Sequence, residues 1–287
     1  MYQAKIQNAN GEVMLLTNDE AKYQVLSIQG LNPPQAQINT TAIVGLDGAK
    51  FNSSKLDTRN IVINIKINGD VEANRLALYR YFITKKWCRF YYSNESRNVY
   101  IDGYVDNVEC DYFTNNEIAQ ISIICPDPYF KALTEIITEV SDVLALFTFP
   151  FSINEDHPIP FSQYEDTPTA RIYNDCDGDT GVVIKIQVNT NVSMINIEKV
   201  NTGEYIQLED SFLTGDVITI NTNIGSKGIT LLRGTTTTNI LSKMALSSTF
   251  FEINPGYNIF NYTTNLGQAD NDELTVHFLY RNSYRGV

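Results

Sequence analysis

The closest approach to a metal-binding motif in this sequence is a short acidic segment at positions 175–181. Its three aspartates occur at alternate positions beside a glycine: Asp175, Asp177 and Asp179. Carboxylate oxygens at this spacing resemble a Ca²⁺-binding loop. An EF-hand, however, needs glycine at its sixth position and glutamate at its twelfth, where this chain has Thr180 and Ile186. The spacing therefore favours a tight acidic turn before a strand, with a calcium loop as the alternative.

Acid–base catalysis near neutral pH would depend on two histidines, His157 and His277. His157 lies among prolines, and His277 alternates with apolar residues, as expected for the solvent side of a strand. The sequence contains no nucleophile elbow, zinc-protease motif, phosphate-binding loop or dinucleotide fingerprint. We therefore predict that the protein is not an enzyme and has no catalytic, cofactor-binding or metal-binding residues. A cell-wall hydrolase with two paired carboxylates is the enzymatic alternative.

Aromatic side chains suggest a second kind of chemistry, because the apolar faces of sugars stack on exposed rings. The candidates in the second half of the chain are Tyr173, Tyr205, Tyr257, Tyr262 and Tyr284. The single tryptophan, Trp87, lies in the first half. Large aromatic side chains more commonly fill the cores and edges of sheets, and we favour that interpretation. A carbohydrate-binding or receptor-adhesion module is the alternative.

The overall charge argues against partners that are themselves acidic. The chain of 287 residues has 21 Lys and Arg against 33 Asp and Glu, which gives a formal net charge of −12. Its basic residues are scattered, whereas nucleic acids and anionic membranes require clustered cations. We therefore expect no sequence-specific nucleic-acid binding and no membrane association. Hydrophobic residues make up 43% and charged residues 19%, a globular composition with enough length for two domains.

The four cysteines show no pairing pattern. They are Cys88, Cys110, Cys125 and Cys176, with no Cys-x-x-Cys among them. This spacing suits neither a dense disulfide scaffold nor a zinc site, so we expect reduced, buried thiols. The first residues lack the charged and apolar regions of a signal peptide, and the most apolar stretch, 143–151, is too short to span a bilayer. The chain is therefore expected to fold in a cytoplasm, without a membrane anchor.

The first half of the chain predicts β-structure with one helix. Alternating isoleucines predict a half-buried strand at residues 60–67, and the long polar stretch before it, 45–57, is expected to be a functional loop. Asp70 then provides an N-cap for a helix. The apolar stripe of this helix contains Leu76, Tyr79, Phe82 and Ile83. Further strands are expected at 88–92, 99–105, 108–112 and 117–125, with a hairpin turn at Asn115 and Asn116.

A proline-rich region separates this part from a second β-rich part. The prolines that stiffen it are Pro150, Pro158, Pro160 and Pro168. Beyond residue 170, alternating runs at 182–188 and 274–280 and regularly spaced glycines predict a sandwich. We therefore predict a mainly β protein with an N-terminal β domain at 1–130, a proline-rich linker or hinge at 131–169, and a C-terminal β-sandwich at 170–287.

The order and spacing of several short strings resembles the distal tail proteins, the Dit-like components of siphophage tails. In the first domain these strings are GLDGAKF at 45–51, RNIVINIKI at 59–67, the helix around 74–76, YIDGYV at 100–105 and CPDPYF at 125–130. FTFPF at 147–151 is similar to the family's hinge. In the second domain, NPGYN at 254–258 and YRGV at 284–287 are of the expected kind. The resemblance runs over nearly the whole chain.

This resemblance implies a structural virion protein of a phage or prophage-derived tail tip or baseplate, assembled in the bacterial host cytoplasm. The N-terminal domain is implied to form a hexameric ring that joins the tail tube to a hub or adhesion device, and the C-terminal domain a galectin-like or carbohydrate-module-like sandwich. The implied partners are the tail tube protein, the tail-associated hub or lysin protein and the tape-measure protein, with a cell-surface glycan as a further candidate. We expect the polar stretch at 45–57 to contact a neighbouring copy in the ring. An acidic lumen would repel passing DNA.

Overall fold

The computed structural model describes residues 3–16, 18–19, 22–45, 47–112, 117–139, 143–145, 162–164, 169–269 and 272–287. The chain divides into two compact units. Unit 1 consists of Met1–Leu133 and Ser283–Val287, and unit 2 of Thr134–Asn282. The chain therefore passes from one unit to the other twice. Among the described residues, no helix is long and apolar enough to cross a membrane.

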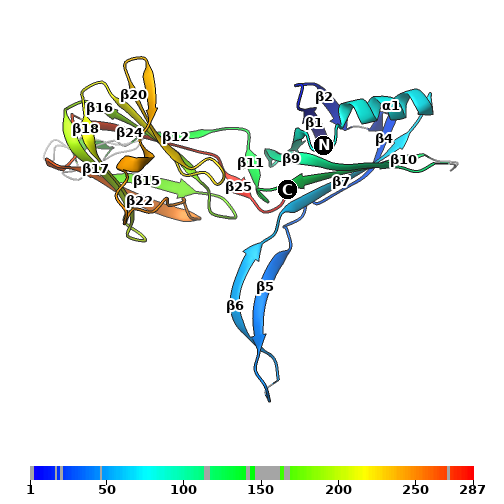
Figure 1. Ribbon diagram of the computed structural model, residues 1–287, viewed down its shortest axis with the longest axis horizontal. Helices are drawn as coiled ribbons and strands as arrows, with labels where there is room; N and C mark the ends of the chain where they lie inside the picture. Colours follow the sequence, from blue (N-terminus) through cyan, green and yellow to red (C-terminus); the bar gives the residue numbers. More distant parts are fainter. Residues whose placement is uncertain are drawn as a thin grey trace, which may run out of the picture. The chain divides into compact units, whose positions relative to one another are not determined.

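Unit 1 is built on one antiparallel ten-stranded sheet with a helix on it (Figure 1). Its elements are β1 (Gln3–Asn8), β2 (Val13–Leu16), β3 (Asn18–Asp19), β4 (Tyr23–Gln29), β7 (Arg59–Ile67), α1 (Val71–Tyr81), β8 (Trp87–Ser93), β9 (Asn98–Cys110), β10 (Ile118–Cys125), β11 (Phe130–Ala132) and β25 (Ser283–Tyr284). The main path runs β2-β1-β8-β9-β10-β7-β4-β3, and β11 pairs with both β9 and β25. A separate two-stranded hairpin, β5 (Ala36–Ala42) and β6 (Ala49–Leu56), is inserted between β4 and β7.

The core of unit 1 follows the period-two pattern of its strands. In β7 every second residue is buried, and the isoleucines at 61, 63, 65 and 67 all face the core, as predicted. Ile61 and Ile63 are the cross-strand partners of Ile123 and Ile121 on β10, which are also buried. Paired β-branched residues on one face stabilise a sheet through their packing. This sheet is the rigid base from which the hairpin extends.

The predicted helix is present, but its buried stripe differs from the prediction. The Asp70 side chain accepts a hydrogen bond from the Ala73 amide at 3.2 Å, which confirms the N-cap. Leu78 is fully buried, whereas Leu76 is 42% exposed. The prediction that Leu76 and Ile83 face the core is therefore wrong. Both residues lie on exposed positions, because the sheet contacts the turn of the helix that carries Leu78.

Two further expectations for unit 1 are corrected. Residues 99–105 and 108–112 were expected as two strands, but β9 is one 13-residue strand. The register against β10 shifts at Asp106, so the break in the pattern is a β-bulge and not a turn. The polar stretch at 45–57 is not a loop, because residues 49–56 form β6. The predicted turn at Asn115 and Asn116 lies outside the described residues.

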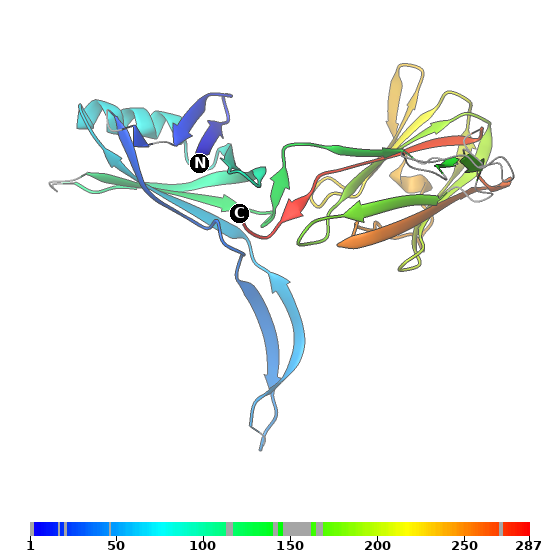
Figure 2. The ribbon, with the colours of Figure 1, turned by 180° about the vertical axis from the view of Figure 1, so that it is seen from behind.

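Unit 2 is a β-sandwich. One sheet has the order β12-β24-β16-β19-β20-β21, and the other has β15-β22-β17-β18 with β23 paired to β22. The elements are β12 (Ile136–Glu139), β13 (Val143–Ala145), β14 (Ser162–Tyr164), β15 (Thr169–Asn174), β16 (Val182–Val188), β17 (Val192–Lys199), β18 (Glu204–Phe212), β19 (Val217–Asn221), β20 (Gly228–Arg233), β21 (Thr236–Asn239), the 3₁₀ turn η1 (Leu241–Lys243), β22 (Gly256–Thr264), β23 (Gly267–Gln268) and β24 (Leu274–Tyr280). β13 and β14 pair with each other. Figure 2 shows the two sheets from behind.

The two sheets of unit 2 share one hydrophobic core. Phe260 on β22 stacks on Phe278 on β24 with ring centroids 4.9 Å apart, and Phe251 lies 5.3 Å from Phe260. All three rings are buried. Inward residues alternate with outward ones along β16 and β24, as the sequence predicted. The prediction of a mainly β protein with a C-terminal sandwich is confirmed.

The structure divides the chain differently from the predicted boundaries. Residues 136–139, placed in the linker by the sequence, form β12, which pairs with β24 inside unit 2. Residues 283–287, placed in the C-terminal domain, belong to unit 1, where β25 pairs with β11. A strand belongs to the unit whose sheet accepts and donates its backbone hydrogen bonds. The residues of the strand do not reveal which sheet that is. Most of the proline-rich stretch 140–168 lies outside the described residues.

Candidate assembly surface

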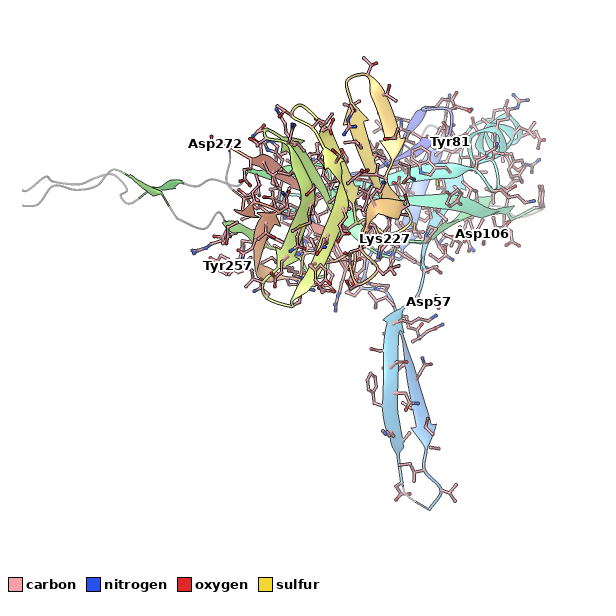
Figure 3. All side chains as sticks on the ribbon, turned by 60° about the vertical axis from the view of Figure 1, so that its left-hand side comes forward. Asp57, Tyr81, Asp106, Lys227, Tyr257 and Asp272 are labelled. Carbon is pink, nitrogen blue, oxygen red and sulfur yellow. The ribbon has the colours of Figure 1, made fainter. Side chains whose placement is uncertain are left out.

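The β5–β6 hairpin stands apart from the sheet of unit 1. Its two strands pair with each other along their full length. Neither strand pairs with any other strand among the described residues. Nearly every residue in it is exposed. In Figures 1 and 2 it projects from the end of β7 as a separate arm, and in Figure 3 its side chains stand clear on both sides, with Asp57 labelled at its root. An isolated two-stranded hairpin is marginally stable in water, so this arm needs a further surface to pack against.

The register of the hairpin sorts its side chains onto one apolar and one polar face, because cross-strand partners point to the same side. The partners on the apolar face are Ala36 with Leu56, Ile38 with Ser54, Thr40 with Phe51, and Ala42 with Ala49. Phe51 and Ile38 are 60% and 63% exposed. Val44 near the tip is fully exposed. This face leaves apolar surface in water that only a second surface can cover.

The opposite face of the hairpin is polar, and several of its side chains form hydrogen bonds with one another. The partners on it are Gln37 with Lys55, Asn39 with Ser53, and Thr41 with Lys50. Asn39 Nδ2 donates to Ser53 Oγ at 3.0 Å, and Asn52 Nδ2 donates to Thr41 Oγ1 at 2.6 Å. These groups can remain in water without loss. The hairpin therefore presents one face suited to a protein interface and one suited to solvent.

Arg59 fixes the root of the hairpin. It is the first residue of β7 and is only 2% exposed. Its Nη1 donates to the carbonyls of Gly30 and Asn32, the second at 2.7 Å, just before the chain enters β5. Gly30 has a φ of +86°, and a Cβ there would overlap the Asn60 carbonyl oxygen, so this position requires glycine. Burial lowers the pKa of Arg59, and the carbonyls that accept its hydrogen bonds compensate the buried charge.

A second candidate surface lies on the outer face of β8 and β9. Arg89 donates two hydrogen bonds to Asp102, at 2.7 and 2.9 Å, and these bonds raise the pKa of its guanidinium. The same guanidinium stacks 4.2 Å from the centre of the Tyr100 ring and 5.5 Å from that of Trp87. Arginine and aromatic residues dominate the energetics of protein interfaces. Because their rotamers are already fixed, these side chains lose little entropy when a partner binds.

The sheet of unit 1 also ends in short edge strands. β2 forms one end of the main path and β3 the other. On β2, Val13 and Leu15 are exposed. An edge strand with apolar side chains presents unpaired backbone groups to another chain. These edges are a second means by which copies of unit 1 can associate.

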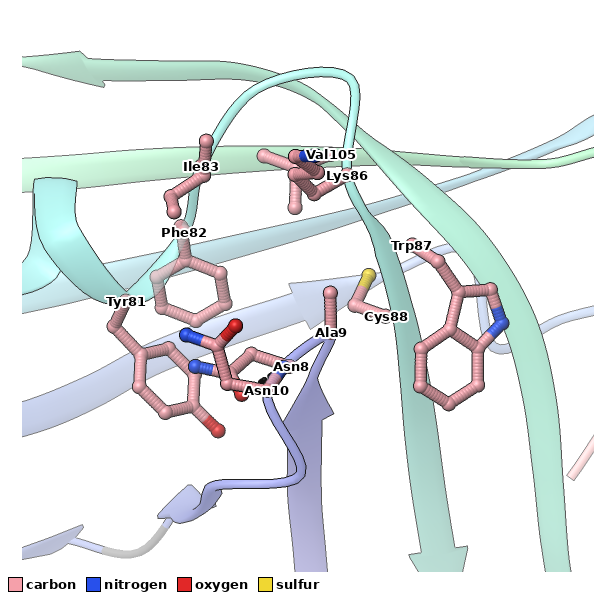
Figure 4. Close-up of a pocket in the computed structure, with 10 residues that line it drawn as sticks. All are labelled: Asn8, Ala9, Asn10, Tyr81, Phe82, Ile83, Lys86, Trp87, Cys88 and Val105. Carbon is pink, nitrogen blue, oxygen red and sulfur yellow. Dashed lines mark hydrogen bonds between the residues drawn. The ribbon is translucent and has the colours of Figure 1, made fainter.

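A pocket of about 210 Å³ opens beside the end of α1 (Figure 4). Asn8, Asn10 and Phe82 lie together on one side of it, and Trp87 lies on the other (Figure 4). Burial raises the pKa of the Cys88 thiol at this pocket to about 12, so the thiol stays protonated at neutral pH. Neither a histidine nor a carboxylate is among the residues that line the pocket.

The acidic segment at 175–181 forms a turn held by its neighbours. The Asn174 side chain accepts from the Cys176 amide at 3.1 Å and donates to the Gly178 carbonyl at 3.3 Å. Asp179 Oδ1 accepts from Asn254 at 2.7 Å. Nowhere in the described part of the chain do three His, Cys, Asp or Glu residues gather in a way that could hold a metal ion. These hydrogen bonds form the tight acidic turn that the sequence favours.

The five candidate tyrosines are dispersed. Tyr262 is fully buried in the core of unit 2, and Tyr284 belongs to unit 1. The Tyr205 hydroxyl donates to Ser247 at 2.6 Å. Only Tyr173 and Tyr257 come together: they are cross-strand partners, with ring centroids 4.8 Å apart and exposures of 55% and 73%. A pair of exposed rings at the edge of a sheet is the part of this set that could contact a ligand.

The chain has two histidines and four cysteines. His277 lies on β24, on the side opposite the buried Val276 and Phe278, while His157 is outside the described residues. All four cysteines are buried, and none forms a disulfide. Burial raises the pKa of the Cys125 thiol to about 12. The prediction of buried thiols is confirmed.

Sequence comparison finds two family matches. Residues 13–125 match the family described as a phage tail protein RIFT-related domain, and residues 175–284 match the C-terminal domain of the siphovirus-type tail component. Together they cover most of unit 1 and most of unit 2. No curated protein sequence matches the chain.

Solved structures of phage proteins share the fold. The Dit protein of phage SPP1, described as a paradigm of the hub adsorption apparatus in phages that infect Gram-positive bacteria, is 12% identical, with a TM-score of 0.69 over 98% of each chain. A chain of the phage p2 baseplate in its activated conformation with calcium is 14% identical, with a TM-score of 0.54 over 100% of each chain. The corresponding structure with strontium gives the same values. At these identities the likeness concerns the fold.

Proposed function

We propose that this chain, which belongs to the siphovirus-type tail component family as a distal tail protein, closes six copies into a ring through unit 1. Its role as a structural protein of the phage tail tip or baseplate follows from the two family matches. The apolar face of the β5–β6 hairpin is the observation that supports the ring. Ile38 and Phe51 on this face are exposed on an arm with no packing partner among the described residues. Such a face implies a protein partner, and a neighbouring copy always supplies one.

The proposed contact joins two different surfaces, as a closed ring requires and a two-fold dimer does not. A hairpin that lies on a different surface of the next copy makes a heterologous contact. Heterologous contacts repeated by a fixed rotation close into a ring when the rotation returns to the first copy, and otherwise give an open filament. The Arg89 surface and the edge strand β2 are suitable surfaces for the opposite side of each copy, because both belong to unit 1. The ring would therefore use two different faces of the same unit.

In this proposal the ring joins the tail tube to a hub or lysin protein, with the tape-measure protein as a further partner, and it assembles in the host cytoplasm. The protein has a structural role and no catalytic role. The excess of acidic residues lies in unit 2, because unit 1, which would form the ring, has 14 acidic and 14 basic residues. The composition of unit 1 therefore does not support the acidic lumen that the net charge of the whole chain suggested.

Native mass spectrometry of the purified chain tests the ring. We expect a six-fold multiple of the 32.4 kDa chain, with annular particles in negative stain. Replacement of residues 36–56 by a short Gly-Ser linker should give monomers with an intact unit 2. A chain that stays monomeric at high concentration in its natural form would refute the ring, whereas rings formed without the hairpin would refute its role in the contact.

Binding of a cell-surface glycan by unit 2 is a second candidate function, supported by Tyr173 and Tyr257. Their exposed rings form an edge on which the apolar face of a sugar can stack. A glycan array of host cell-wall polysaccharides probed with the full chain should give signals that are lost in Tyr257→Ala. An array without signal, or a signal that persists in that variant, would dismiss this site.

A further inference from the structure

The Arg59 side chain contacts two further segments besides the root of the hairpin. Its Nε donates to the Pro128 carbonyl at 2.8 Å, and its Nη2 donates to the Arg285 carbonyl at 2.5 Å. Its guanidinium also lies 4.5 Å from the centre of the Phe130 ring. One buried side chain thus holds the segment that enters the hairpin, the segment where the chain leaves unit 1, and the segment where it returns.

The returning segment, Ser283–Val287, is docked along its length within unit 1. Tyr284 is the cross-strand partner of Phe130 on β11. Arg97 donates to the Gly286 carbonyl and stacks 4.3 Å from the centre of the Tyr284 ring. These contacts hold the segment between β11 and the loop that carries Arg97.

The last two residues of this segment touch the root of the hairpin itself. The Val287 amide donates to the Leu31 carbonyl at 3.1 Å. A Cβ on Gly286 would come within 3.0 Å of Pro33 Cδ, so this position is already in tight contact with the root. Leu31, Asn32 and Pro33 are therefore held from one side by Arg59 and from the other by the returning segment. Residues 31–35 form no strand. The contacts with Arg59 and with the returning segment take the place of the hydrogen bonds that a sheet would provide.

We propose that Arg59 and the segment Ser283–Val287 together form a latch that sets the direction of the β5–β6 hairpin. The segment follows unit 2 in the chain, so the latch closes only after unit 2 has been synthesised. Before that, the guanidinium lacks one of its acceptors and the root lacks one of its two supports. The latch thereby restricts ring assembly to chains that already carry both units. This consequence rests on the proposed role of the hairpin in the ring, whereas the latch itself does not.

Pulsed electron resonance on the full chain tests the direction of the hairpin without reference to the ring. Spin labels are placed at Lys50→Cys on the hairpin and Ala77→Cys on α1, and labelled protein is diluted with unlabelled protein. The buried native thiols at Cys88 and Cys125 are poor targets because their pKa values are raised to about 12. In the otherwise natural chain we expect one narrow distance distribution.

Two variants open the latch from different sides. Arg59→Gln removes the charged donor, and Gly286→Val pushes the returning segment away from Pro33 while Arg59 remains. Both should replace the narrow distribution by a broad one and raise the protein concentration needed for ring formation at least about tenfold. Arg233→Gln, which removes an ion-paired arginine in unit 2, should leave the distribution narrow.

The outcomes separate the latch from the ring. A narrow distribution in Arg59→Gln overturns the latch; if that variant does not fold, the same result in Gly286→Val does so. Broad distributions in both variants support the latch even where the natural chain forms no ring, in which case only the proposed ring fails. If a variant with a broad distance distribution still forms rings at the normal concentration, the latch does not restrict ring assembly.

Discussion

Replacing Phe51 by serine should weaken the ring without unfolding the subunit. Phe51 is 60% exposed on the apolar face of the hairpin. A phenylalanine side chain has a surface area of roughly 200 Å², so the contact between copies would bury about 120 Å² of apolar surface that is exposed in the monomer. At about 25 cal/mol per Å², this burial contributes ~3 kcal/mol to each interface, or roughly 100-fold in its dissociation constant. The stability of the monomer should not change, since Phe51 contributes to neither hydrophobic core.

Mass photometry across a dilution series measures this effect directly. The concentration at which half of the chains are in rings should rise steeply in Phe51→Ser, because every interface in the ring is weakened at once. Asn39→Ser on the polar face of the same hairpin serves as the matched control and should leave the midpoint unchanged. An unchanged midpoint in Phe51→Ser, or an equal shift in Asn39→Ser, would refute the assignment of the apolar face as the contact.

Three further outcomes test other parts of the structure. Leu78→Ala should lower the free energy of unfolding of unit 1 by about 2–5 kcal/mol, whereas Leu76→Ala should cost under about 1 kcal/mol, as followed by urea unfolding. A water-soluble thiol reagent at pH 8 should leave Cys88 unmodified until denaturant is added, because burial raises the pKa of its thiol to about 12; rapid labelling of native protein would contradict its burial. Hydrogen bonds from Arg233 lower the pKa of the buried Asp216 carboxyl in the folded state, so this group stabilises unit 2 above about pH 3.9 and the contribution is lost as the pH falls through the lowered pKa. Thermal melts from pH 7 to pH 2 should show a smaller acid-induced decrease in Asp216→Asn than in the natural chain.

Local pattern was sufficient for much of the fold. The alternating isoleucines of β7 and the alternation in β16 and β24 predicted strands, because side-chain direction along a strand depends only on position in the chain. The Asp70 cap marked the start of α1 for a similarly local reason. The buried face of that helix was not predictable in the same way. Leu76 and Leu78 are equally apolar, and only the position of the sheet determines which of them is buried.

The candidate surface depended on pairings that the sequence does not display. The sequence predicted a functional loop at 45–57, because the apolar residues of this stretch are interleaved with Asn, Ser and Lys. Only the register with β5 places Phe51 beside Thr40 and separates it from Asn52, and thereby produces an apolar face.

The sequence by itself determined the class of fold, the family, and the absence of a recognisable catalytic motif, since these follow from composition, periodicity and the order of short strings. Tertiary structure alone decided where the units begin and end. Ser283–Val287 follows unit 2 in the chain but completes unit 1, because its backbone groups bond to β11 and to the root of the hairpin. Arg59 contacts Arg285 across 226 positions of sequence. A contact between residues so far apart produces no recognisable pattern in the sequence, because it depends on where two folded segments meet in space.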